Sequence, residues 1–275
     1  MATDIKNTPQ PILLTDADPV EGSYLTALKE FFLEVARLTR FTGRFFREVV
    51  KPPYELNMVI KQCYSLGYKS FPLIAITGFI MGLVLTIQSR PTLADFGAVS
   101  WLPAMVAISI VREIGPVIAA LIFAGKVGSG IGAELASMKV TEQIDAMEVS
   151  GMNPFKYLVV TKVVSATLML PVLVIAADAI ALGGAYIGCN LQGAVNVHLF
   201  FLDVFQKLSF SDIYPATIKT FFFGFFIGII GCYKGYYSKQ GTEGVGIAAN
   251  SAVVIGSLAV FIIDMIAVQV TSMFN

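Results

Sequence analysis

The run GAELASMKVTEQIDAMEVSGMNP, from Gly132 to Pro154, is charged and amphipathic, although long apolar segments flank it on both sides. Taken as one helix turning by about 100° per residue, it predicts that four acidic residues share roughly a third of the circumference. These residues are Glu134, Glu142, Asp145 and Glu148. A short acidic helix between membrane spans suits docking to a soluble partner, and an ordinary solvated loop helix is the alternative.

An apolar ridge is expected on the other side of the same helix. Val140, Ile144 and Met147 follow one another at i, i+4 and i+7, which places them on one face. Gly151 is suited to end the helix, with Pro154 just beyond it. The ridge would supply the apolar part of a partner contact or anchor the helix under the spans.

The composition of the 275 residues is that of a polytopic membrane protein. The mean hydropathy is +0.74 and only 14% of residues are charged. Nineteen basic and nineteen acidic residues cancel, so the charge does not point to a nucleic-acid partner. Three scattered cysteines and one histidine, His198, have no metal-ligand spacing. We therefore expect an all-α fold without a metal.

Five segments are apolar and long enough to cross a hydrocarbon core of ~30 Å, so we expect about five transmembrane helices in a permease-like domain over 67–275. They are Ser70–Ser89, Trp101–Gly125, Val163–Gly188, Ala216–Tyr233 and Ile247–Met273.

The residues before the first span divide into two parts. Residues 1–22 are polar and proline-containing, which predicts a flexible tail. Residues 23–66 predict an amphipathic segment at the membrane interface. Its first part is a helix over Ser23–Lys51, which Pro52 and Pro53 end, and its second part is a short segment over 54–66 that leads to the membrane. The basic stripe of the helix consists of Arg37, Arg40, Arg44, Arg47 and Lys51.

The distribution of basic residues predicts the orientation. Fifteen of the nineteen lie before the first span, between spans two and three, or after span four, whereas only Arg90 and Lys207 lie in the other loops. Because basic loops stay in the cytoplasm, the N-terminus and the acidic segment are predicted to be cytoplasmic and the C-terminus outside.

Charges inside the spans are candidates for function, since a charge in a bilayer usually faces a cavity or a partner. Arg112 and Glu113 are adjacent and point about 100° apart, so they are not expected to pair with each other. Lys219 is placed to approach one of them from span four. The charges either line a path for a lipid headgroup or form a structural ion pair. Asp178 and Asp264 are weaker candidates.

Two glycine-rich patterns stand out in the chain. Glycines at 224, 228, 231 and 235 form a stripe on span four, which favours close packing within one subunit over a dimer seam. The run GKVGSGIG, Gly125–Gly132, does not satisfy a Walker A loop, because Val127 follows Lys126. No nucleophile–base arrangement was found, so the chain is predicted to be neither an ATPase nor another enzyme.

The run from Arg112 to Leu135, together with Glu142–Pro154, resembles the MlaE/YrbE family of ABC-transporter permeases. The resemblance implies a phospholipid-transport subunit of the bacterial inner membrane, a homodimer, a separate ABC ATPase that binds ATP, a periplasmic MCE-domain partner, and no cofactor in this chain. It implies that residues 132–151 are the coupling helix that meets the ATPase, and that Arg112, Glu113 and Lys219 stand at matching positions of the substrate path. The coupling residues would be Glu134, Glu142, Gln143, Asp145, Met147 and Glu148.

Two other functions are compatible with parts of the pattern. An ion-coupled secondary transporter would use Glu113, Asp178 and Asp264 to relay protons or bind sodium. Five spans and no recognisable internal repeat disfavour it. A membrane-embedded lipid enzyme is disfavoured by the missing catalytic constellation.

Overall fold

The computed structural model describes residues 21–52, 54–191 and 196–274, and these residues form helices with no strand among them. The all-α prediction is confirmed. The tail predicted over 1–22 lies outside the described residues except for its last two positions. Within the described residues, five helical stretches are long and apolar enough to cross a membrane, as predicted.

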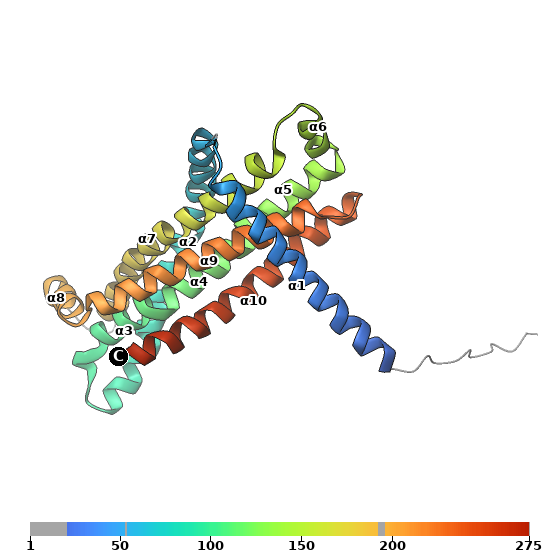
Figure 1. The fold of residues 1–275 in the computed structure, drawn as a ribbon. Coiled ribbons are helices and arrows are strands. Elements are labelled where there is room, and N and C mark those ends of the chain that lie inside the picture. The colour runs from blue at the N-terminus through green and yellow to red at the C-terminus, as the bar shows by residue number, and fades with distance from the viewer. Residues whose placement is uncertain (1–20, 53, 192–195, 275) are drawn as a thin grey trace, which may run out of the picture. The chain divides into compact units, whose positions relative to one another are not determined.

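Each of the five spans contains one of the predicted segments and extends it. They are α2 (Leu56–Asp95), the composite span Val99–Val140, the composite span Phe155–Leu191 that contains α7 (Thr161–Leu191), α9 (Phe210–Tyr236) and α10 (Thr242–Phe274). Helix α2 packs along α7, α7 along α9, and α9 along α10. Figure 1 shows these helices side by side. A short helix, α8 (Val197–Lys207), lies between the third and fourth spans.

Residues 42–275 form one compact unit, and the division from residues 1–41 falls inside α1 (Glu21–Val49). The predicted amphipathic helix is therefore present, and its place at a membrane interface stays a prediction. The short segment expected over 54–66 is continuous with the first span, because α2 begins at Leu56 and runs through that span. Contact with α7 supports this early part: the Ser165 hydroxyl donates to the Val59 carbonyl at 3.0 Å.

The second span is not a uniform α-helix. It consists of η1 (Val99–Trp101), α3 (Leu102–Ser109), the π-helical turn η2 (Ile110–Ile114), α4 (Gly115–Phe123), a second π-helical turn η3 (Ala124–Gly128) and α5 (Ser129–Val140). A π turn inserts an extra residue and rotates the side chains that follow it; such turns recur at functional sites. Arg112 and Glu113 both lie in η2.

Glycines allow the long helices to approach closely. A Cβ at Gly224 of α9 would lie 2.6 Å from the Ala166 carbonyl oxygen of α7, and one at Gly235 would lie 2.7 Å from the Gly132 oxygen of α5. A Cβ added at any of the four glycines of the predicted stripe would contact another helix of the same chain. The prediction that this stripe packs within one subunit is confirmed.

Candidate functional site

Lys219 of α9 is the centre of a charge cluster among the spans. Its side chain is 5% exposed, and its Nζ lies 2.6 Å from Glu113 Oε2 of η2 and 2.9 Å from Asp264 Oδ1 of α10. The prediction that Lys219 approaches one of the two adjacent charges is confirmed, with Glu113 as the partner. Asp264, a weaker candidate in the sequence, is the second carboxylate. The cluster joins three elements that are distant in the chain.

Arg112 and Glu113 have different ion-pair partners, in line with the prediction that they do not pair with each other. The Arg112 guanidinium lies 3.7 Å from Asp212 Oδ1 in the first turn of α9. The other carboxylate oxygen of Asp212 accepts hydrogen bonds from the backbone N–H and the hydroxyl of Ser209, at 3.1 and 2.8 Å, and these bonds cap α9. One carboxylate therefore starts the helix that carries Lys219 and also faces Arg112.

Lys219 lies between two cavities of different character. Arg112, Glu113, Asp212 and Lys219 contribute to a narrow charged pocket between η2, α9 and α10. Beside it, α9 and α10 line an open groove of about 690 Å³ with a largely apolar lining. Its larger apolar residues are Tyr214, Ile218, Phe222, Phe226, Ile263 and Ile266. An apolar groove with a charged edge is suited to an amphiphile, with hydrocarbon in the groove and a polar group at Lys219.

The acidic segment is two helices rather than the single helix that its periodicity predicts. Helix α5 ends at Val140, the chain turns at Thr141 and Glu142, and α6 runs from Gln143 to Val149. The turn places Glu142 at φ 57°, in the left-handed region that side chains other than glycine rarely adopt. The one-helix geometry is therefore wrong, and Glu134 does not share a face with the acidic residues of α6.

Glu134 has a different partner. Its carboxylate lies 2.7 Å from Nζ of Lys162 on α7; the Lys162 side chain is 1% exposed and that of Glu134 is 54% exposed. The pair joins the end of the second span to the start of α7. The sequence indicates a loop position for Lys162, whereas the structure buries it inside a helix.

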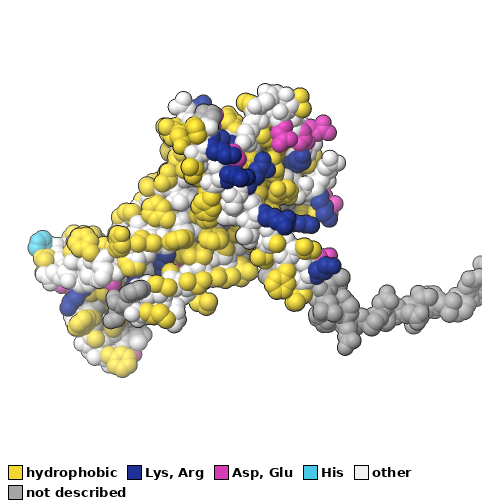
Figure 2. Space-filling model, viewed as in Figure 1, with side chains coloured by type: hydrophobic (Ala, Val, Ile, Leu, Met, Phe, Trp, Pro, Cys, Tyr) yellow, Lys and Arg dark blue, Asp and Glu magenta, His cyan; other side chains and the backbone are white. Residues whose placement is uncertain are grey.

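The remaining predicted coupling residues, apart from Met147, form an exposed acidic surface on and beside α6. Glu142, Gln143, Asp145 and Glu148 are exposed, and Figure 2 shows acidic side chains gathered over this helix. Lys139 forms an ion pair with Asp145 across the turn, with 2.7 Å between Nζ and Oδ1. Of the predicted ridge, Ile144 is buried, whereas Val140 and Met147 are half-buried. The ridge thus anchors α6 through Ile144.

The predicted end of α6 at Gly151 is confirmed. Gly151 has φ 77°, and its N–H donates to the Glu148 carbonyl at 3.0 Å. The Met152 N–H donates to the Met147 carbonyl at 3.1 Å, closing the final turn.

Asp178 does not join the Lys219 cluster. Its Oδ1 is buried without a hydrogen-bond partner in the described part of the chain and packs against Gly115, just after η2. Glu113 and Asp264, the other carboxylates of the ion-coupled alternative, both contact Lys219. The structure thus brings together two of those three carboxylates around a cation.

In a comparison with known proteins, residues 59–270 match the family model described as "Permease MlaE". A probable ABC transporter permease protein of Rickettsia typhi is 39% identical over 233 residues, covering 85% of this chain and 90% of that protein. The intermembrane phospholipid transport system permease protein MlaE of Haemophilus influenzae is 35% identical over 211 residues, covering 76% and 80%. A probable ABC transporter permease protein of Synechocystis is 31% identical over 236 residues, covering 86% and 90%.

Proposed function

The chain belongs to the MlaE permease family, and from this premise we propose that it moves phospholipid as the membrane subunit of an ABC transporter. The transporter would exchange lipid between the bacterial inner membrane and a periplasmic MCE-domain partner. A separate ATPase subunit would bind and hydrolyse ATP. In this proposal the chain is a transport component rather than an enzyme, and its N-terminus is cytoplasmic.

The observation that carries the proposal is the position of Lys219 at the edge of the apolar groove. About 690 Å³ falls within the range of roughly 300–1,000 Å³ typical of ligand pockets. Hydrocarbon would lie against residues such as Phe222 and Ile266, and a lipid phosphate would approach Lys219 and Arg112. Glu113, whose side chain is 40% exposed, is the carboxylate that a headgroup would displace from Lys219.

The ATPase would dock on the acidic surface of α6. Glu142 and Glu148 are exposed there, and basic groups of a soluble subunit would complement them. Each chain offers one such surface, whereas ABC ATPases act as pairs. We therefore propose that the permease is a homodimer, and that native mass spectrometry of the complex shows two copies of this chain.

The experiment that tests the lipid path uses a matched pair of variants. Ile266→Trp fills the groove, whereas Ile262→Trp adds the same bulk at an exposed position of α10 outside the lining residues. Mass spectrometry of the purified complexes should find phospholipid with the wild type and with Ile262→Trp, and several-fold less with Ile266→Trp. Equal phospholipid in all three would contradict the assignment of the groove.

A further inference from the structure

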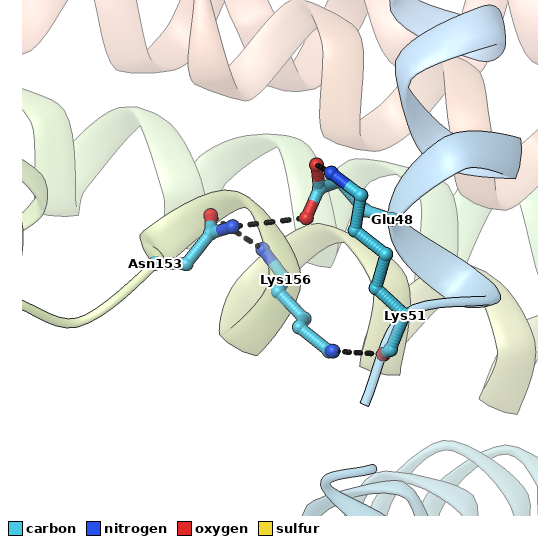
Figure 3. A network of polar contacts seen from close by, with 4 residues as sticks. All are labelled: Glu48, Lys51, Asn153 and Lys156. Carbon is cyan, nitrogen blue, oxygen red and sulfur yellow. Dashed lines mark hydrogen bonds and ion pairs between the residues drawn. The ribbon is translucent and has the colours of Figure 1, made fainter. Parts of the chain in front are cut away.

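The segment that follows α6 is joined to the last turns of α1. The Asn153 amide donates from Nδ2 to Glu48 Oε2 at 3.0 Å, although the two residues are 105 positions apart (Figure 3). The Asn153 side-chain oxygen also accepts from the backbone N–H of Lys156 at 3.3 Å, at the start of the π-helical segment η4 (Phe155–Val160). One side chain thus connects the exit from α6, the entry to the third span and α1.

Two further contacts support the same junction. The Lys156 ammonium donates to the backbone carbonyl of Lys51 (Figure 3). The Arg44 guanidinium lies 4.3 Å from the ring centroid of Phe155, which is fully buried. The end of α1 therefore holds residues on both sides of Pro154.

The end of α1 is itself anchored and is not a loose arm. Phe45 and Phe46 both lie 5.6 Å from the Phe225 ring of α9, measured between centroids, and Phe45 is buried. Lys51 Nζ donates to Glu48 Oε1 at 3.2 Å, so both carboxylate oxygens of Glu48 are engaged. The hydrogen bond from Lys51 is the largest contribution that lowers the pKa of Glu48, so the Glu48 carboxylate is charged at neutral pH.

We infer that Glu48 and Asn153 are positioning residues that hold α6 in place for its ATPase partner. The inference rests on the proposed function, because it assumes that α6 is the docking surface. Helix α6 is tied on its N-terminal side by Lys139 and Asp145, and the Asn153–Glu48 bond ties its C-terminal side. A displacement of α6 by a bound ATPase would therefore be transmitted to the end of α1 as well as to the spans.

The test compares four variants in the complex purified from native membranes. Asn153→Ala and Glu48→Ala both remove the bond between α1 and the α6 exit. Glu48→Gln keeps an acceptor for the Asn153 amide, so it should retain most of the function. Lys51→Ala is the matched control, because it removes the ion pair to Glu48 but keeps the backbone carbonyl that Lys156 uses.

We expect Asn153→Ala and Glu48→Ala each to weaken ATPase binding about tenfold, the effect of losing one hydrogen bond to a charged group. ATP hydrolysed per lipid transferred should rise in both. The double variant should be no worse than either single variant, since they remove the same bond. Melting temperatures should stay close to the wild-type value, and Glu48→Gln and Lys51→Ala should bind ATPase nearly normally.

Wild-type ATPase binding by Asn153→Ala would overturn the inference while leaving the proposed function intact. Loss of the melting transition in Asn153→Ala and Glu48→Ala together with ATPase binding would assign the bond to folding and overturn it too. If the wild-type complex carries no ATPase, the proposed function fails first. These outcomes separate the two claims.

Discussion

Lys162 and Lys219 are both buried lysines in spans, with side chains 1% and 5% exposed, yet their surroundings differ. Within the described residues, Lys162 forms an ion pair with Glu134, whose carboxylate is about half exposed. Lys219 has two carboxylates from two other elements and lines the apolar groove. The same ion-pair chemistry thus joins two elements in one place and borders the apolar groove in the other.

The difference also decides which partner matters for stability. A buried ion left without its partner is costly, whereas an exposed one is solvated by water. At the Glu134–Lys162 pair the buried member is the base. In the Lys219 cluster the base is buried too, and its loss leaves two partly exposed carboxylates close together without a cation.

The largest expected effect is that of Lys219→Met. The change leaves Glu113 and Asp264 facing each other without a cation, at a cost of roughly 3–5 kcal/mol, lessened by the partial exposure of Glu113. Denaturation of the purified permease in detergent would measure the loss. Adding Glu113→Gln and Asp264→Asn should restore much of the stability. An unchanged melting temperature for Lys219→Met alone would show that these ion pairs do not contribute to the stability of the fold.

The next effect distinguishes the two members of the second pair. Glu134→Ala leaves the buried Lys162 cation without a partner and should cost several kcal/mol, up to about 3–5. Lys162→Met removes the buried charge and leaves an exposed carboxylate, so it should cost no more than about 1 kcal/mol. Thermal stability of the two single variants gives the comparison. Equal losses would mean that Glu134 is also held away from water.

The smallest effect on stability is expected at α6, where the charges are exposed. Glu142→Lys with Glu148→Lys should change the free energy of unfolding by less than about 1 kcal/mol. The same variant should lose ATPase binding and lipid transfer, because it reverses the docking surface. Asp95→Lys with Asp203→Lys is the control: it reverses two exposed acidic side chains that lie outside α6. Normal ATPase retention by the charge-reversed variant would leave α6 as a solvated loop helix.

Much of the fold follows from hydropathy and spacing. The structure contains the five apolar segments, the end at Gly151, the intrasubunit glycine stripe and the separate ion-pair partners of Arg112 and Glu113. All four are local or periodic properties of the sequence. The approach of Lys219 to Glu113 was predictable because a charge inside a span needs a partner.

Other features depend on contacts that no local pattern reveals. The turn at Thr141 and Glu142 contains neither glycine nor proline; Lys139 bridges it to Asp145, and Ile144 is buried beyond it. Lys162 resembles a loop base in sequence and becomes buried because Glu134, 28 positions earlier, reaches it. Asp264 joins Lys219 only once α9 and α10 pack together.

The central claim is that the Lys219 cluster serves lipid movement as well as stability. The direct measurement is ATP-dependent transfer of a fluorescent phospholipid from proteoliposomes that contain the whole complex. We expect transfer by the wild type and a loss of about tenfold or more in the variant that combines Lys219→Met, Glu113→Gln and Asp264→Asn, although that variant folds and binds the ATPase. Wild-type transfer by this charge-free variant would contradict the claim and leave the cluster a purely structural ion pair.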